Sequence, residues 1–309
     1  MKKLLIAVTL LLTSVGTTLY LSPSALLASV QFTERQLAGL SLKRAQVGDL
    51  NLTYYEGGPT DAPTILMIHG FGADKDNWLR FAKPLTDTYH VIALDLPGFG
   101  ESSKPDASYD VGSQTERLAA FSKQLGLHKL HLIGNSMGGH IAALYAARHP
   151  EQVLSVALLD NAGISSPNKS EMFQRIERGE PNPLLVNNTA DFNNMLSFVF
   201  VEQPILPEAL KQHFAEQSIA NRPLNEKIFS HLRERYIPLE PELAKIQAPT
   251  LLLWGDKDRV LDISSIAIMQ PLLKQSSVVV MKDCGHVPMI ERPSETAGHY
   301  QAFLNGLKG

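Results

Sequence analysis

The segment that most limits the fold of this chain runs from Leu130 to Leu144, where a short apolar run leads through a glycine-flanked serine into a helical pattern. The turn between them reads Gly134-Asn135-Ser136-Met137-Gly138, which is the pattern G-x-S-x-G. A turn this tight presses its neighbours together, so small residues at Gly134 and Gly138 let Ser136 project above a sheet. The sequence therefore predicts a strand, a sharp turn that presents a hydroxyl, and a helix whose N-terminal amides favour negative charge.

Short β-rich apolar runs alternate with helical stretches along most of the chain, which predicts an α/β fold with a mostly parallel central sheet flanked by helices. An interval from about Ile164 to Ala248 is richer in Asn, Gln and Pro and shows helical patterns without a convincing strand. We interpret this interval as an inserted helical cap, or lid. The predicted strands are Ile65–Ile68, Val91–Leu94, Leu130–Ile133, Val156–Leu159, Thr250–Trp254 and Val278–Met281.

The N-terminus predicts that the chain leaves the cytoplasm. Lys2 and Lys3 precede an uncharged, mainly apolar run from Leu4 to Leu21, close to the ~20 residues with which a helix spans a bilayer. The run is either an uncleaved transmembrane anchor or a signal segment whose removal leaves the protein periplasmic or secreted. We favour the anchor, because the run is long for a signal peptide and Ser22-Pro23-Ser24 is a poor cleavage context. The folded domain then lies outside the bacterial inner (cytoplasmic) membrane.

The predicted organisation has four parts. Residues 1–23 form the anchor or signal segment, and residues 24–49 form a juxtamembrane amphipathic helix and linker, since apolar residues recur there near helical spacing. This helix either lies on the lipid surface or packs on the domain. Residues 50–163 and 249–309 form the core, and residues 164–248 form the cap.

Composition argues against several other classes of protein. With 44% hydrophobic residues, 19% charged residues and a formal net charge of −3, nothing suggests attraction to nucleic acid. The single cysteine, Cys284, cannot form an internal disulfide. We expect no metal and no cofactor, and the oligomeric state stays open between a monomer and a homodimer.

A serine hydroxyl is a poor nucleophile at neutral pH, so Ser136 needs a base that a third group holds in the right tautomer. His286 directly follows the last predicted strand and gives the chain order serine, acid, histidine. The loop after Thr250–Trp254 offers two aspartates as the acid. Asp258 is preferred, because the strand ends at Gly255 and a residue three positions further on can curl over the sheet edge toward the histidine.

Two other aspartates stay open as the acid. Asp256 sits where it would more naturally cap the turn. Asp160 ends another predicted strand and could also reach the site.

Acyl transfer also needs two N–H groups that bind the oxyanion. One is expected from Met137, next to the nucleophile. The other is expected from Phe71, in a loop of sequence His69-Gly70-Phe71-Gly72 whose glycines let the backbone turn its amides inward. His69 is expected to hold that loop by hydrogen bonding, and Asp95 to belong to a structural turn.

From about residue 50 onward these motifs resemble the α/β hydrolases. Within that superfamily the chain is similar to bacterial family V lipases and membrane-tethered phospholipases A, through Gly134–Gly139, Asp160–Gly163, Asn182–Leu185, Trp254–Asp258 and Gly285–Met289. The resemblance implies carboxylic-ester hydrolysis of acyl lipids such as phospholipids or acylglycerols, no metal, a helical lid and an N-terminal membrane helix. It assigns the triad to Ser136, Asp258 and His286 and the oxyanion hole to Phe71 and Met137. Candidates for substrate contact are Asn135, Leu184, Leu185, Met195 and Phe198.

Two other functions are alternatives to ester hydrolysis. Relatives that hydrolyse carbon–carbon bonds of ring-cleavage products use the same triad, but they often carry Trp after the catalytic histidine, where this chain has Val287. A binding protein that had lost catalysis would lack a triad member, and none is missing here. Ester hydrolysis is therefore the preferred function.

Overall fold

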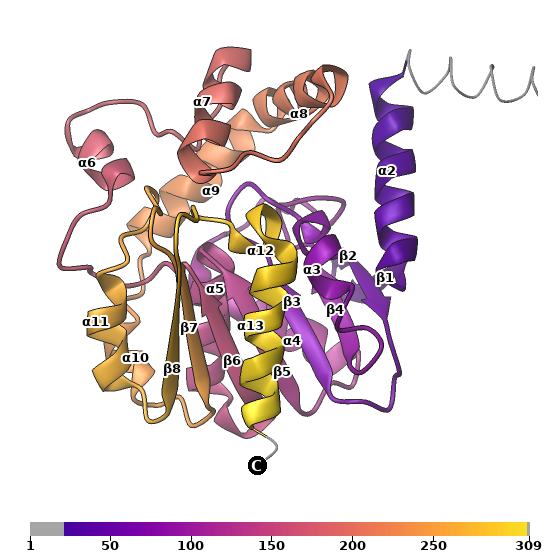
Figure 1. Cartoon of the computed structure of the whole chain (residues 1–309), viewed down its shortest axis with the longest axis vertical. Helices are drawn as coiled ribbons and strands as arrows, with labels where there is room; N and C mark the ends of the chain where they lie inside the picture. Colours follow the sequence, from indigo (N-terminus) through magenta and orange to yellow (C-terminus); the bar gives the residue numbers. More distant parts are fainter. Residues whose placement is uncertain (1–21, 308–309) are drawn as a thin grey trace, which may run out of the picture.

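The computed structural model describes residues 22–307, and all six predicted strands are confirmed in it (Figure 1). They run parallel to one another within a sheet of order β1-β2-β4-β3-β5-β6-β7-β8. Every residue of β3, β4, β5 and β7 is buried, which explains why these strands read as continuous apolar runs. The six are β3 (Thr64–Ile68), β4 (His90–Leu94), β5 (Leu130–Asn135), β6 (Val153–Leu159), β7 (Thr250–Gly255) and β8 (Ser276–Met281).

Two antiparallel strands at one edge of the sheet, β1 (Leu40–Val47) and β2 (Leu50–Gly57), were not predicted. Strand β1 lies within residues 24–49, so the expectation of a helix and linker is wrong for the second half of that stretch. The physical reason is its edge position: only the first and last residues of β1 are buried, and charged side chains such as Lys43 and Arg44 occupy its middle. Such a strand has no apolar run by which to recognise it.

Helix α2 (Pro23–Leu37) is the amphipathic helix expected before the core, and it contacts the folded domain. The Arg80 guanidinium donates two hydrogen bonds, of 2.8 and 2.9 Å, to Glu34 of this helix. None of the residues of α2 is buried, and Phe32 and Leu37 are more than half exposed. The predicted membrane segment Leu4–Leu21 lies outside the described residues. Within residues 22–307, no helix is long and apolar enough to cross a membrane.

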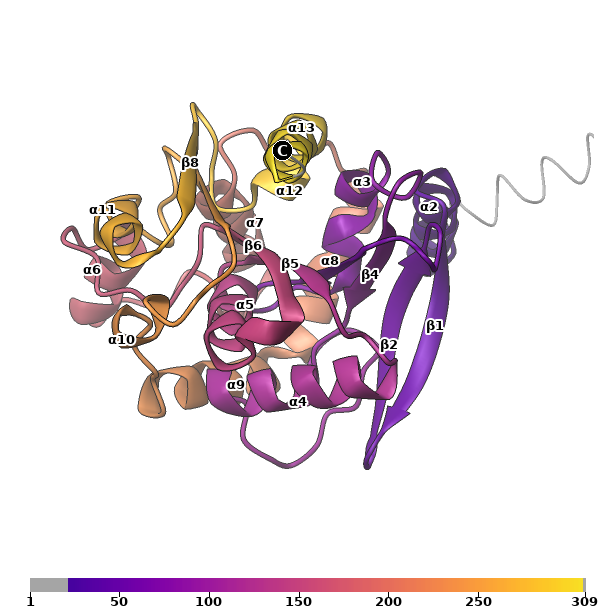
Figure 2. The same cartoon turned by 90° about the horizontal axis from the view of Figure 1, so that it is seen from below.

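Helices cover both faces of the sheet, and each face has its own hydrophobic core (Figure 2). The larger core contains Tyr145 and Trp254, and the smaller one contains Phe81 and Tyr300. The first face carries α4 (Val111–Gln124), α5 (Met137–Arg148), α10 (Glu240–Leu243) and α11 (Ser265–Met269). The second face carries α3 (Leu79–Ala82), α12 (Pro288–Glu291) and α13 (Pro293–Gly306).

Five helices fill the interval between β6 and β7, and the first four of them lie over one end of the sheet (Figure 1). These cap helices are α6 (Glu171–Glu177), α7 (Thr189–Val199), α8 (Glu208–Ala220) and α9 (Arg222–Glu234). Residues 164–248 contain no strand. The cap has a small apolar core of its own around Phe192, and a second cluster joins Phe198 to Val260 of the sheet domain. Packing therefore fixes the cap over the carboxyl ends of the strands.

Candidate functional site

Ser136 lies in the sharp turn between β5 and α5, where the sequence placed it. Its backbone is in a strained conformation, with φ 55° and ψ −120°. A Cβ atom added to Gly134 would lie 2.2 Å from the carbonyl oxygen of Gly138, and one added to Gly138 would lie 2.2 Å from that of Ile68. Both glycines are therefore sterically required, because any side chain would collide with backbone. The turn lifts Ser136 above the central strands of the sheet.

His286 and Asp258 form a buried hydrogen-bonded pair next to this turn. His286 Nδ1 lies 2.8 Å from Asp258 Oδ2, and the side chains are 6% and 0% exposed. The other Asp258 oxygen accepts the backbone N–H groups of Val260 and Leu261 at 2.7 and 3.1 Å. A carboxylate held at both oxygens makes Nδ1 the protonated ring nitrogen, which leaves Nε2 free to accept a proton.

Asn135 joins the Gly134–Gly138 turn, which we call the elbow, to the loop that carries His286. Its Nδ2 donates to the carbonyl oxygens of His286 at 2.9 Å and of Leu159 at 3.2 Å, and the residue is 1% exposed. Both amide hydrogens are used within the protein, so this candidate for substrate contact instead fixes the backbone of His286. The Ser136 hydroxyl forms no hydrogen bond with any of residues 22–307, which leaves it available to a reactant.

The loop after β3 lies against Ser136. A Cβ atom on Gly70 would come within 3.2 Å of the Ser136 Cβ, so the next residue, Phe71, has its amide beside the elbow. His69 holds the loop as expected: its Nδ1–H donates to the Gly70 carbonyl at 2.8 Å, and its Nε2 accepts the Leu96 amide at 3.0 Å. Burial lowers the pKa of His69, which keeps this ring neutral. Met137 is the first residue of α5, so its N–H has no partner within the helix.

Asp95 has a structural role, as expected. Its carboxylate accepts the backbone N–H groups of Lys75 and Glu101 and forms an ion pair of 2.9 Å with Lys75 Nζ. The two paired side chains are 0% and 4% exposed. This buried pair braces the rim of the loop that contains Phe71.

The two alternative acids occupy different places. Asp256 accepts the Asp283 N–H at 2.6 Å and pairs with Lys257, so it caps the turn and does not contact the histidine. Asp160 is completely buried beside Asp258. Burial and the nearby Asp258 charge raise the pKa of Asp160 well above the usual range of a carboxyl.

Three groups at this point could in principle surround a cation. One ligand atom each from Asp160, Asp258 and His286 lies within 4.8 Å of the other two. However, both oxygens of Asp258 and the Nδ1 of His286 already form hydrogen bonds with one another or with backbone. These atoms are therefore arranged for proton transfer.

The histidine loop is also tied to the cap. The His286 N–H donates to the Val199 carbonyl at 2.9 Å, at the end of α7. The Glu291 carboxylate accepts the N–H of Gly285 at 3.0 Å, and on the cap side those of Val201 and Glu202 at 3.3 and 2.9 Å. One side chain therefore bridges the histidine loop and the cap.

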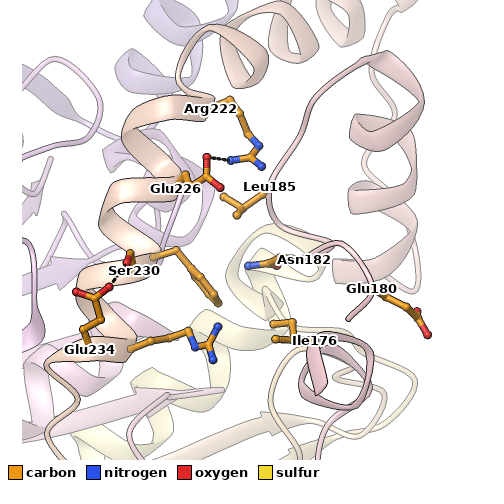
Figure 3. A pocket seen from close by; sticks show the side chains of 10 residues that line it. Ile176, Glu180, Asn182, Leu185, Arg222, Glu226, Ser230 and Glu234 are labelled. Atoms are coloured by element: carbon orange, nitrogen blue, oxygen red, sulfur yellow. Dashed lines mark hydrogen bonds and ion pairs between the residues drawn. The ribbon is translucent and has the colours of Figure 1, made fainter. Parts of the chain in front are cut away.

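A cavity of about 630 Å³ lies between α9 and the segment that follows α6 (Figure 3). The predicted contact residue Leu185 lines it, whereas Phe198 is buried under the Arg259 guanidinium, 4.4 Å from its ring centroid. Leu184 and Met195 pack against the cap clusters and do not line this cavity. The cavity is lined by Ile176, Glu180, Asn182, Leu185, Arg222, Glu226, Phe229, Ser230, Arg233 and Glu234.

Phe229 is a site residue that the sequence analysis missed. Its ring lines the cavity and contacts the Phe71 ring edge-on, with centroids 5.7 Å apart. The Phe229 ring therefore lies between this cavity and the Phe71 loop, and Phe71, Ser136 and His286 are not among the residues that line the cavity. The only available signal was an aromatic residue within an amphipathic helical pattern, and that pattern also fits ordinary cap packing.

Comparison with known proteins is consistent with this geometry. Residues 63–293 match the family model described as alpha/beta hydrolase fold. Lipase 3 of Moraxella sp. (strain TA144) is 38% identical over 89% of this chain and 88% of its own length, and monoacylglycerol lipase ABHD6 of Mus musculus is 33% identical over 91% and 88%. A crystal structure described as a membrane phospholipase A, a novel bacterial virulence factor, is 63% identical with a TM-score of 0.93, and all of each chain is covered.

Proposed function

Because this chain belongs to the α/β hydrolase fold family and is a carboxylic-ester hydrolase, we propose that Ser136, His286 and Asp258 form its catalytic triad. The hydrogen bond of 2.8 Å between His286 and the buried carboxylate of Asp258 carries this proposal. This hydrogen bond orients His286 as a base, and the Asn135 side chain holds the loop of His286 against the elbow. A serine, a base and an acid arranged in this way are what acyl transfer requires.

The mechanism follows from the arrangement of these three side chains. His286 Nε2 removes the proton of Ser136 as Oγ attacks the ester carbonyl, and Asp258 stabilises the imidazolium that forms. The N–H groups of Phe71 and Met137 bind the oxyanion of the tetrahedral intermediate. The histidine then gives its proton to the leaving alcohol, and a water molecule, activated in the same way, releases the acid from the acyl-enzyme.

We further propose a membrane glycerophospholipid as the ester substrate. Support comes from the similarity to lipases and to a membrane phospholipase A. The cavity under the cap is large enough for part of an acyl chain or head group, and both apolar and charged side chains line it. An N-terminal anchor at Leu4–Leu21 would hold the site beside lipid outside the cytoplasm, and the apolar length of that run supports this placement.

A release assay tests both parts. Full-length protein and Ser136→Ala are offered phospholipid vesicles, monoacylglycerol and a short p-nitrophenyl ester, with Ser277→Ala, at an exposed strand position, as the matched control. We expect fatty-acid release from all three by the wild type and by Ser277→Ala, and a loss of roughly 10⁴- to 10⁶-fold in Ser136→Ala. A wild-type rate in Ser136→Ala would overturn the triad. Release from glyceride and short ester alone would overturn the phospholipid substrate.

A further inference from the structure

One carboxyl oxygen of Asp160 accepts a hydrogen bond from the protein backbone, and the other receives none. The residue follows β6 directly and is 0% exposed, and its Oδ1 accepts the Gly255 N–H at 2.9 Å. Its Oδ2 is buried, and no N–H or O–H donor among residues 22–307 reaches it. Burying a polar atom without a hydrogen-bond partner costs free energy, so a partner for this oxygen is expected.

The carboxylate of Asp258 lies beside that of Asp160. The two carboxyl groups and the His286 ring approach within 4.8 Å of one another, and both aspartate side chains are fully buried. Two carboxylates this close in a buried site cannot both be ionised. Asp258 accepts three N–H donors and Asp160 accepts one, so Asp258 holds the charge more favourably.

We propose that Asp160 is a neutral carboxylic acid whose Oδ2–H donates a hydrogen bond to the Asp258 carboxylate, which makes it a positioning residue for the triad. The inference rests on the proposed function, because it takes Asp258 as the acid that orients His286. The proton satisfies the orphaned oxygen and gives Asp258 a fourth donor. It also leaves a single negative charge to face the imidazolium that forms during the reaction.

The backbone at Asp160 is consistent with a functional constraint. Its φ is 44°, in the left-handed region that only a few per cent of non-glycine residues adopt, Asn, Asp and His most often. Two other titratable groups act on it: Glu291, which three backbone N–H groups hold, and Cys284, a buried thiol whose pKa burial raises. Neither supplies a hydrogen bond to Asp160, so Asp258 is the acceptor that the geometry offers.

Two substitutions test the proposal on the full-length protein. Asp160→Asn keeps an N–H donor for Asp258 and an oxygen for Gly255, and asparagine tolerates the positive φ. Asp160→Gly removes the carboxyl group and also relieves the backbone strain. We expect Asp160→Asn to keep kcat within about threefold of the wild type, and Asp160→Gly to lower kcat by about tenfold or more with KM nearly unchanged, which is the result of losing one hydrogen bond in the transition state.

The pH profile of kcat/KM separates positioning from a charge effect. A neutral Asp160 predicts that the acidic limb of the profile is the same in Asp160→Asn and in the wild type. An ionised Asp160 would support the imidazolium, so its replacement would shift that limb toward lower pH by roughly two units at this separation. Such a shift, or a kcat in Asp160→Asn as low as in Asp160→Gly, would overturn the proposal.

Two further results complete the test. Wild-type kcat in a folded Asp160→Gly would also overturn the proposal, because no positioning by the carboxyl would remain. Asp258→Asn serves as the reference variant, and we expect it to lose several orders of magnitude in kcat. Wild-type activity in Asp258→Asn would instead refute the triad itself, which keeps the two failures distinguishable.

Discussion

The side-chain amide of Asn135 donates a hydrogen bond of 2.9 Å to the main-chain carbonyl of His286, so the residue before Ser136 holds the backbone of the proposed base. We expect Asn135→Ala to lower kcat for a short ester by about tenfold or more. The reason is that the His286 backbone loses its link to the elbow and two buried carbonyls lose their donor, at a cost of about 1–3 kcal/mol in stability.

Asn161→Ala is the matched control, because Asn161 is equally buried but donates only to Ala162. It should lower the melting temperature without a comparable loss of kcat. Equal losses of kcat in the two variants would contradict the link.

The elbow glycines should tolerate no side chain. In Gly138→Ala the new Cβ would lie 2.2 Å from the Ile68 carbonyl oxygen, so we expect a loss of at least about 3 kcal/mol in the free energy of unfolding, or no folded protein. In Gly298→Ala, within α13, a Cβ meets nothing within 4 Å, and a gain of up to about 1 kcal/mol is expected. Urea unfolding measures both. An unchanged stability of Gly138→Ala would show that the elbow does not approach β3 this closely.

Glu291→Gln should loosen the cap and the histidine loop together. An amide has only one oxygen to accept the N–H groups that the carboxylate now holds on both sides, so some of these bonds must be lost. We expect faster hydrogen exchange at the Val201 and Glu202 amides and a kcat lower by about tenfold. Glu295→Gln, at a surface ion pair with Arg292, should change neither quantity. Unchanged exchange in Glu291→Gln would rule out the bridge.

His140 predicts an acid-dependent loss of stability. Its Nε2 donates to the Ile237 carbonyl, and burial lowers its pKa from 6.5 to about 4. The unfolded chain therefore binds a proton below pH 6.5, and the folded protein binds it only near pH 4, so stability falls as the pH drops through this window. The loss amounts to about 3 kcal/mol, at about 1.4 kcal/mol for each pKa unit.

His140→Gln keeps a donor for Ile237 and has no titration in this range. Chemical unfolding of both proteins at pH 7 and pH 4 should show the wild type losing about 3 kcal/mol more than the variant. Parallel stability curves would mean that His140 is not buried as a neutral ring.

The sequence predicted the central parallel strands β3, β4, β5 and β7 because their burial on both faces makes them continuous apolar runs, and it predicted the edge strand β8 from its run of three valines. It could not predict β1, since this edge strand is exposed along most of its length. The elbow was predictable because its glycines meet a local steric requirement, as the backbone contacts of Gly134 and Gly138 show. Asp258 and His286 were predictable from their places after β7 and β8.

Sequence patterns could not predict the contacts between segments that are distant in the chain. Asn135 and His286 are 151 residues apart, and nothing in the local sequence distinguishes an amide that binds backbone from one that binds substrate. The same holds for Phe229 against Phe71, and for Asp160, which was considered only as an alternative acid. Each of these contacts depends on tertiary packing near the end of a strand or helix. The hydrophobic periodicity of the sequence does not encode such packing.

The Val199 carbonyl that accepts the His286 N–H limits how the cap can be exchanged between relatives by recombination. A transplanted lid would bring its own backbone to the junction, and His286, the proposed base, would lose its support unless that junction presented a carbonyl at the same place. It would also have to present two N–H groups to Glu291. A chimera that retains residues 199–202 from this chain and replaces only the helices before them should therefore keep its chemistry while its substrate preference changes.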